Sequence, residues 1–348
     1  MRVRLLQAMA GAEHGGAEAF FVRLAIALER AGVEQRLVLR GYPDRLASLR
    51  AASIEPVTAR FGGLLDLRSG GRLRAEIASF RPDVVLTWMN RASAFCPTPA
   101  RAGHEFVSAG RLGGYYKLKY YRRCRHLIAN TRHIASYLMD QGWPSERVHY
   151  LPNFVQAERA AAEPRARHQT PDGVPLLLGL GRLHPNKAFD TLLRALAELP
   201  EAHLWLAGEG PEQSRLEALT RELGLAARVR FLGWREDTAA LYAAADVFVC
   251  PSRHEPLGNV VIEAWAQGLP VVAAAAAGPA ALIGEGESGL LVPVDDPQAL
   301  AAALRGLLDD SGLAARLAQG GLAAYRAEFN EDVVVARYLD FFARVSKT

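Results

Sequence analysis

Two carboxylates stand eight positions apart in the stretch HEPLGNVVIEAWAQG, residues 254–268. They are Glu255 and Glu263, and a Pro-Leu-Gly bend separates the first from a run of helix-forming residues. In one continuous helix they would lie about 80° apart around the axis and about 12 Å apart along it, too far to share a ligand. A bend through Gly258 and a helix from about Asn259 would let both flank a group at the helix N-terminus. We therefore predict that geometry.

Two cations precede another predicted helix. Arg182 and Lys187 follow the buried strand in LGLGRLHPNKAFDTLL. Guanidinium and ammonium groups beside the free N–H groups of a helix start can bind a diphosphate. Two solvated loop cations are the alternative. The glycines of AGEGP, after the next strand, would let the backbone approach a ligand, although such a pair also fits an ordinary turn.

The two acids then take separate tasks. A carboxylate near a helix start in a Rossmann-like fold can accept hydrogen bonds from both ribose hydroxyls of a nucleotide, which is the task we expect for Glu263. Favourable interaction with the helix dipole, worth about 0.3–1 kcal/mol, is the alternative for this residue. The amides near Leu257, Gly258 and Asn259 would face the phosphates. Glu255 would then be free to bind the hydroxyls of a sugar attached to the diphosphate.

Length and composition indicate a globular α/β protein of two domains. The chain has 348 residues, of which half are hydrophobic and 22% are charged. The three cysteines, Cys96, Cys124 and Cys250, form no C-x-x-C pair, so we expect neither a disulfide nor a zinc site. The N-terminal apolar run is too short for a secretory signal or a membrane span. A cytoplasmic location is expected.

The charge is unevenly distributed. Residues 1–165 carry 25 Lys and Arg against 14 Asp and Glu, whereas the remainder carries 16 against 23. A basic half favours an anionic partner such as a phosphate-bearing lipid, a nucleic acid or a membrane surface. Tyr115–His126, YYKLKYYRRCRH, interleaves aromatics with cations in a way typical of surfaces that meet lipid headgroups. A helix with its tyrosines packed inward is the alternative, as is an arginine-rich half without a partner.

Strand and helix patterns alternate along both halves, as in parallel sheets. A Pro-, Ala- and Arg-rich stretch at 157–174 is interpreted as the linker between them. Ligands bind beyond the carboxyl ends of such strands. The predicted strands lie in VRLLQAM, EQRLVLRG, PDVVLTW and RHLIANT of the first half and in PLLLGLGRL, AHLWLAGEGP, RVRFLGW, DVFVCPS, PVVAAAAAG and GLLVPV of the second.

The ordered segments GRL, LAGEGP, FLGW, EPLGNVVIEAWAQGLPVV and GLLVPV strongly resemble the C-terminal domain of retaining glycosyltransferase family 4. The resemblance implies the GT-B fold, α/β with two facing Rossmann-like domains, parallel sheets and a deep interdomain cleft. We expect an acceptor-binding domain at 1–160 and a nucleotide-sugar domain at 161–325. It also implies that a C-terminal helix, 326–348, crosses back to the N-terminal domain.

The first half matches that family less densely. HGGAE, residues 14–18, resembles its glycine-rich loop, which implies that Gly15 and Gly16 bind the donor and that Glu18 lies on the acceptor side. Asn153 of LPNFV resembles an Asn-containing segment, although the usual Gly and Asp do not follow. Many members carry a histidine after a mid-domain strand, where this chain has only Arg111 nearby. Arg111 and Asn153 are therefore expected, like Glu18, on the acceptor side. His104 and His126 are expected to be structural or surface residues.

The resemblance implies retaining transfer of a hexose-type sugar from a nucleotide diphosphate donor, with a UDP-sugar favoured, to a glycan or lipid-linked acceptor in polysaccharide or lipopolysaccharide synthesis. Glu255, Arg182 and Lys187 are the expected catalytic residues, and no metal or other cofactor is implied. We also expect peripheral contact with anionic membrane at its inner face and no nucleic-acid partner. A sugar-nucleotide 2-epimerase of similar fold is the alternative, and a degenerate partner subunit is disfavoured because all four site side chains are present.

Overall fold

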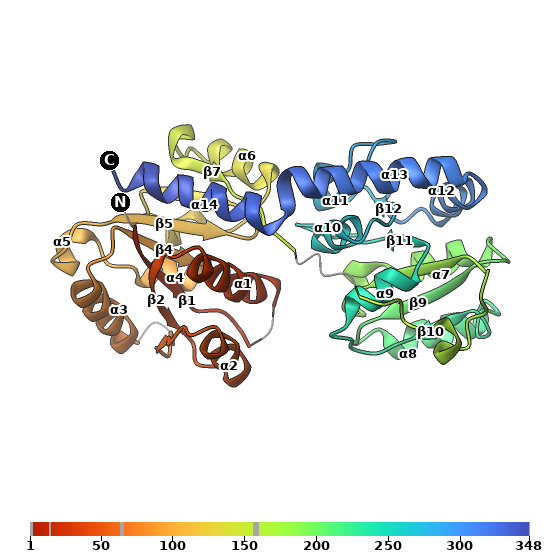
Figure 1. Cartoon of the computed structure of the whole chain (residues 1–348), viewed down its shortest axis with the longest axis horizontal. Coiled ribbons are helices and arrows are strands. Elements are labelled where there is room, and N and C mark those ends of the chain that lie inside the picture. The colour runs from red at the N-terminus through yellow and green to blue at the C-terminus, as the bar shows by residue number, and fades with distance from the viewer. Residues whose placement is uncertain (1–2, 14, 63–65, 156–159, 348) are drawn as a thin grey trace. The chain divides into compact units, whose positions relative to one another are not determined.

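The computed structural model describes residues 3–13, 15–62, 66–155 and 160–347, and the chain divides into two units. Unit 1 comprises residues 1–154 and 331–348, and unit 2 comprises residues 155–330 (Figure 1). We had placed the boundaries at 160 and 325 instead. The His14 of the expected glycine-rich loop lies outside the described residues.

Unit 1 contains a parallel sheet of seven strands in the order β3-β2-β1-β4-β5-β6-β7. The strands are β1 (Arg4–Met9), β2 (Glu34–Leu39), β3 (Val57–Thr58), β4 (Val84–Trp88), β5 (Val107–Leu112), β6 (His126–Ala129) and β7 (Val148–Tyr150). The helices are α1 (Gly16–Arg30), α2 (Pro43–Ala51), α3 (Leu67–Phe80), α4 (Met89–Phe95), α5 (Pro99–Ala102), α6 (Arg132–Asp140) and α14 (Glu331–Val345), with 3-10 turns η1 (Leu118–Tyr120) and η2 (Ser145–Arg147).

The C-terminal helix is part of the unit 1 core. The apolar face of α14 carries Tyr338, Phe341 and Phe342, which are fully or almost fully buried in one cluster with residues of α1 such as Phe20. Figure 1 shows α14 running beside α1. Burial of aromatic side chains provides a large part of the hydrophobic stabilisation of such a contact. The segment after unit 2 is therefore structural in unit 1.

Unit 2 contains a parallel sheet of six strands in the order β10-β9-β8-β11-β12-β13. The strands are β8 (Leu176–Leu180), β9 (His203–Ala207), β10 (Val229–Phe231), β11 (Val247–Cys250), β12 (Val271–Ala274) and β13 (Leu290–Val292). The helices are α7 (Phe189–Ala197), α8 (Gln213–Glu222), α9 (Thr238–Ala244), α10 (Asn259–Ala266), α11 (Ala277–Leu282), α12 (Pro297–Asp309) and α13 (Ser311–Ala324), with short helical turns η3 (Arg165–His168), η4 (Pro185–Lys187) and η5 (Tyr325–Phe329).

The described part of the stretch interpreted as a linker is folded into unit 2. Arg165 donates to the carbonyl of Ala244 at 2.7 Å and pairs with Asp246 at 3.0 Å. The Trp205 indole donates to Thr170 at 2.9 Å. Arg165 and Thr170 therefore hold this stretch against unit 2, and the interpretation of its described part as a linker is wrong. This packing could not be predicted from the Ala- and Pro-rich composition. The contacts are made by Arg165 and Thr170, whose spacing follows neither a helical nor a strand period.

The aromatic and cationic segment is also not a helix. Within Tyr115–His126 only η1 is helical, and β6 begins at His126. Tyr115 and Tyr120 are 40% and 36% exposed, whereas Tyr121 is fully buried. The alternative of a helix with every tyrosine packed inward is therefore wrong.

Candidate functional site

The loops after β8 and β9 lie in direct backbone contact. Gly181 donates to Ala207 O at 2.9 Å, and Leu183 donates to the carbonyl of Glu209 at 2.9 Å. A Cβ atom on Gly208 would overlap the carbonyl oxygen of Gly181, and one on Gly210 would overlap that of Leu183. These glycines of the AGEGP segment are thus required for close packing of two chain segments at the carboxyl edge of the sheet.

The bend before α10 has the predicted geometry. The helix begins at Asn259, and Gly258 precedes it with φ +72°, a left-handed conformation that favours glycine. The segment after β12 packs on this bend, because Gly278 donates to the carbonyl of Glu255 at 2.7 Å. A Cβ on Gly278 would come within 2.8 Å of the Leu257 carbonyl carbon. The bend is therefore fixed from behind by a second close backbone contact.

Lys187 and Glu255 form an ion pair at this bend. The Glu255 side chain is 11% exposed and that of Lys187 is 23% exposed. The Gly258 amide donates to the other carboxylate oxygen at 3.3 Å. Glu255, which we expect to bind sugar hydroxyls, thus already has two partners in the described structure. A carboxylate has about four acceptor sites, so two partners leave room for sugar hydroxyls.

Arg182 is exposed one residue after Gly181, and it makes no ion pair or side-chain hydrogen bond with any described residue. The site thus combines a cation already engaged, Lys187, with one that has no partner in the described structure. Lys187 packs its aliphatic chain near Gly181, whose Cβ would lie 3.2 Å from the Lys187 Cε. Both cations are therefore anchored to the same strand end.

Sequence reasoning missed the residue that ties these loops together. Arg253 donates to the carbonyl of Pro185 at 2.8 Å and pairs with Asp190 at 2.9 Å and with Asp295 at 2.6 Å. The Arg253 guanidinium contributes to holding the pKa of Asp190 below its usual value despite the opposing effect of burial. Arg253 lies two residues before Glu255 in the sequence, and this proximity to a predicted site residue could have identified it. It positions the bend against the segment that carries Lys187.

Glu263 lies on α10 and accepts a hydrogen bond from the Tyr242 hydroxyl at 3.2 Å. Burial raises the pKa of Tyr242 well above its usual value, and the neighbouring Glu263 adds to this effect. The phenol therefore stays a donor at neutral pH and orients the carboxylate. The same helix carries Asn259 at its first position, so α10 positions both residues relative to the bend.

An exposed aromatic adjoins the same edge of the sheet and was also missed. Trp234 is 70% exposed just after β10, and its amide donates to a Glu209 carboxylate oxygen at 3.4 Å. Gly208 donates to the carbonyl of Gly233 at 2.7 Å, which joins this loop to the one after β9. A tryptophan following a strand and a glycine was a visible signal in FLGW.

In unit 1, Glu18 folds back onto the glycine-rich loop. Its carboxylate accepts from the Ala12 amide at 2.8 Å and is 8% exposed. A Cβ on Gly11 or Gly15 would overlap this carboxylate. Glu18 therefore shapes the loop before α1. The donor-binding role of Gly15 and Gly16 and the acceptor-side role of Glu18 stay predictions.

Arg111 and Asn153 are brought together, but in the interior of unit 1. The Arg111 guanidinium donates to Asn153 Oδ1 at 2.5 Å and to the Tyr338 hydroxyl at 2.9 Å. It lies 4.5 Å from the Trp88 ring centroid and 4.7 Å from that of Phe20. Only 2% of Arg111 is exposed, so its described contacts join β5 to α14 and provide cation–π stabilisation.

The other singled-out residues are structural. His126 Nδ1 lies 3.0 Å from His149 Nε2, and His104 Nε2 lies 3.0 Å from the carbonyl of Pro82. Cys96, Cys124 and Cys250 are buried free thiols. Burial raises the pKa of Cys124 to about 12. Among the described residues, no three His, Cys, Asp or Glu side chains form a metal-binding group.

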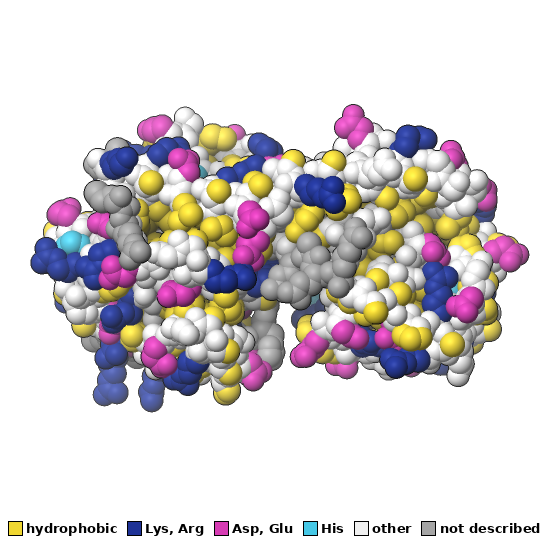
Figure 2. Space-filling model, viewed as in Figure 1, with side chains coloured by type: hydrophobic (Ala, Val, Ile, Leu, Met, Phe, Trp, Pro, Cys, Tyr) yellow, Lys and Arg dark blue, Asp and Glu magenta, His cyan; other side chains and the backbone are white. Residues whose placement is uncertain are grey.

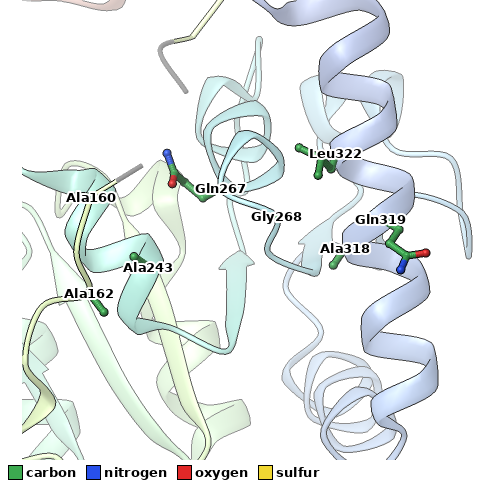
Figure 3. Close-up of a pocket in the computed structure, with 8 residues that line it drawn as sticks. All are labelled: Ala160, Ala162, Ala243, Gln267, Gly268, Ala318, Gln319 and Leu322. Carbon is green, nitrogen blue, oxygen red and sulfur yellow. The ribbon is translucent and has the colours of Figure 1, made fainter. Parts of the chain in front are cut away.

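A hollow of about 510 Å³ in unit 2 is separate from this candidate site (Figure 3). Its lining includes Ala243 and Gly268, which precede β11 and β12 and so lie at the amino edge of the sheet. Gln319 and Leu322 of α13 complete another side of it. None of the predicted site residues lines this hollow. Ligand chemistry is therefore sought at the carboxyl edge.

Two α/β units with parallel sheets, and with cations and carboxylates at the carboxyl ends of the unit 2 strands, have the architecture of the GT-B fold. Residues 14–159 match the family described as Glycosyltransferase Family 4, and residues 174–310 match the one described as Glycosyl transferases group 1. The chain belongs to glycosyltransferase family 4 and is a glycosyltransferase.

Two relatives from Rhizobium meliloti (strain 1021) are similar over nearly their whole length. The lipopolysaccharide core biosynthesis glycosyltransferase LpsE is 38% identical over 331 residues, covering 94% of this chain and 96% of the relative. The corresponding enzyme LpsD is 39% identical over 332 residues, covering 95% of each.

Solved structures show the same fold. Anabaena Alr3699/HepE in complex with UDP has a TM-score of 0.86 and 21% identity, covering 98% of this chain and all of that one. The lipopolysaccharide outer core galactosyltransferase WaaB has a TM-score of 0.77 and 17% identity, covering 98% and 99%.

Proposed function

We propose that this enzyme transfers a hexose-type sugar from a UDP-sugar, with retention of anomeric configuration, to a glycan or lipid-linked acceptor in lipopolysaccharide core synthesis. The observation that carries the proposal is the Lys187–Glu255 pair at the bend before α10. It places a cation and a carboxylate at one helix start, as a sugar diphosphate requires. The names of the Rhizobium meliloti relatives and the UDP in the Anabaena structure support the acceptor and donor classes.

The proposed roles follow from the positions of the side chains. Lys187 and the exposed Arg182 bind the diphosphate, together with the amides near Leu257, Gly258 and Asn259. Glu263, oriented by Tyr242, accepts hydrogen bonds from the ribose hydroxyls. Glu255 uses its remaining acceptor sites for hydroxyls of the transferred sugar.

Catalysis then rests on electrostatic stabilisation. As the bond between the anomeric carbon and the diphosphate oxygen breaks, negative charge grows on the leaving group, where Lys187 and Arg182 are proposed to act. The acceptor hydroxyl attacks the same face and its proton passes to the departing phosphate oxygen. Fixed cations take the task that a metal performs elsewhere, so we propose that no metal is required. The catalytic part of Glu255 is to position the sugar.

The segment Tyr115–His126 is proposed to contact anionic membrane at its inner, cytoplasmic face. Tyr115 and Tyr120 are exposed, and the Lys119 ammonium lies 5.1 Å from the Tyr120 ring centroid. Exposed aromatics beside cations suit the headgroup region of a bilayer. Among the residues described, no helix is both long and apolar enough to cross a membrane.

The donor is tested by a thermal-shift panel of UDP-, GDP- and ADP-sugars, because a ligand that binds the native state raises the Tm. UDP-sugars should give the largest shift. The product is then analysed with lipopolysaccharide core acceptors, and the new glycoside should keep the anomeric configuration of the donor. Donor consumption without a new glycoside would favour the epimerase alternative. An Arg182→Ala enzyme with full turnover, compared with the exposed-arginine control Arg194→Ser, would contradict the diphosphate assignment.

A further inference from the structure

Arginines line adjoining hollows at the carboxyl ends of β2 and β3. One, of about 450 Å³, is lined in part by Arg40 and Arg60. A second, of about 510 Å³, shares Thr58, Ala59 and Arg60 with the first and adds Arg68 and Arg72 of α3. Figure 2 shows cationic side chains gathered where Figure 1 draws α3 and α5. We call these two cavities the arginine hollows.

Of the arginines that line the hollows, Arg72 is ion-paired, whereas Arg40, Arg60 and Arg68 form no ion pair with a residue that the structure describes. Asp66 accepts from the Ser69 hydroxyl at 2.6 Å and from the Gly62 amide at 2.5 Å, and these bonds, the Ser69 hydroxyl first, lower the pKa of Asp66 to about 2. Glu76 is buried and pairs with Arg36 at 2.6 Å and with Arg72 at 3.2 Å. The acids of this region are therefore engaged in holding the fold.

Arg60 and Arg68 are exposed and form no ion pair with any residue that the structure describes. Cations gathered without counter-ions repel one another, so this arrangement does not stabilise unit 1 by itself. It does create a positive potential over the two hollows, where an anion is attracted.

The backbone that carries Arg60 is held in place. Arg40 Nε donates to the Arg60 carbonyl at 2.8 Å, and Arg91 donates to the carbonyl of Phe61 at 3.0 Å. The Phe61 amide donates to the Ser69 hydroxyl at 2.8 Å. Phe61 is fully buried with its ring 5.9 Å from that of Phe95. A preorganised segment of this kind loses little entropy when a ligand binds.

We infer that the arginine hollows bind the phosphate groups of a phosphorylated saccharide, which is the headgroup of the acceptor. Guanidinium groups bind phosphate oxygens in a bidentate way, and the three unpaired arginines of the two adjoining hollows, Arg40, Arg60 and Arg68, suit two phosphate groups. The acceptor role rests on the proposed function, whereas phosphate binding by the hollows does not.

A saccharide fits this surface better than a bilayer does. None of the exposed large hydrophobic side chains in the described structure, Tyr115, Tyr120, Met139, Trp234 and Val294, belongs to the lining of the arginine hollows. Insertion into a membrane interface needs such side chains. Concave, charged hollows without them suit a compact polar headgroup.

The test measures binding of a synthetic glucosamine disaccharide bisphosphate by calorimetry in 50 mM salt, with the unphosphorylated disaccharide as reference. We expect the wild type to bind the bisphosphate at least tenfold more tightly than the reference. Arg60→Ser/Arg68→Ser should raise the Kd for the bisphosphate at least tenfold, and Arg60→Lys/Arg68→Lys should restore part of the affinity. Arg194→Ser, which removes an exposed arginine of α7 in unit 2, should change the Kd less than twofold.

Three further measurements make the result decisive. The Tm of the double serine variant should match the wild type, because neither side chain has an ion pair to lose. The Kd for UDP should be the same in the double serine variant and the wild type. If no protein, the wild type included, binds UDP, the proposed donor is contradicted, and the bisphosphate measurement still tests the hollows. Equal Kd values for wild type and double variant overturn the inference. The inference is also overturned if the wild type does not bind the bisphosphate but binds vesicles of phosphatidylglycerol and phosphatidylcholine, and the double serine variant loses that vesicle binding.

Discussion

Lys187 and Glu255, 68 positions apart in the chain, form an ion pair in which the carboxylate also accepts the Gly258 amide. The pair joins the loop after β8 to the bend after β11. Each charge therefore fixes the position of the other at the helix start. The energetic and catalytic parts of this contact can be separated by mutation.

Lys187→Met should lower kcat/KM about 10²- to 10³-fold, the cost typical of removing one donor to a developing negative charge. It should also lower stability by about 1–3 kcal/mol, because it leaves the mostly buried Glu255 without its cation. Lys187→Met/Glu255→Gln should recover part of the Tm but none of the activity. Turnover within tenfold of the wild type in the single variant would show that Lys187 does not face the leaving group.

Glu263→Ala should lower the affinity for UDP about tenfold while affecting 2′-deoxy-UDP much less, because hydrogen bonds from a hydroxyl to a carboxylate contribute about 1.5–3 kcal/mol. The wild type should therefore discriminate between the two nucleotides and the variant should not. Tyr242→Phe is the matched control, since it removes the 3.2 Å hydrogen bond to Glu263 but keeps the carboxylate. Undiminished discrimination in Glu263→Ala would assign the ribose to another residue.

Gly210→Ala should destabilise unit 2 by about 1–3 kcal/mol and weaken UDP binding, because the added Cβ would overlap the carbonyl of Leu183. Gly306→Ala is the control. No atom lies within 4 Å of the Cβ position at Gly306 in α12, so alanine should stabilise this helix by about 0.5–1 kcal/mol. Chemical denaturation measures both effects. Opposite signs are expected, and a neutral Gly210→Ala variant would argue against the close packing of the two loops.

Much of the fold could be predicted because buried parallel strands are long apolar runs. The ten strands quoted from the sequence correspond to β1, β2, β4, β6 and β8–β13. β3 and β7 were missed because two or three residues carry too little pattern, and β5 because Ser108, Gly110 and Arg111 interrupt its apolar run. Helix α13 was missed because its small residues give a weak amphipathic pattern.

The parts of the candidate site that depend on local backbone conformation could be predicted from the sequence. Contacts between side chains from distant segments could not. Gly258 and the helix start at Asn259 follow from local chain preferences. The Lys187–Glu255 pair depends on two loops that meet only in the folded sheet. Arg111 was expected on the acceptor side from the family resemblance, but its described environment of Trp88 and Phe20 has no local sequence signal.

The His126–His149 pair should make unit 1 less stable in acid. Burial, together with the nearby cations of Arg125 and Arg147, lowers the pKa of His126 below its ordinary value of 6.5. Burial first, then His126 and Arg344, lowers the pKa of His149 to about 4. As pH falls from about 6.5 to about 4, the unfolded chain takes up protons that the folded protein excludes, so the free energy of unfolding falls.

This loss should be largely removed in His149→Phe. The His149 ring already packs on Phe341 of α14, with centroids 4.7 Å apart, so a phenyl ring can occupy the same place. Urea unfolding between pH 7.5 and pH 4.5 measures the difference, which we expect to be of order 1 kcal/mol across that range after screening by solvent. The variant should resemble the wild type at pH 7.5 and exceed it at pH 4.5. If the free energy of unfolding depends on pH equally in the wild type and in His149→Phe, other groups cause the acid sensitivity. A histidine that the folded protein keeps neutral gives a pH dependence that is lost when the histidine is replaced.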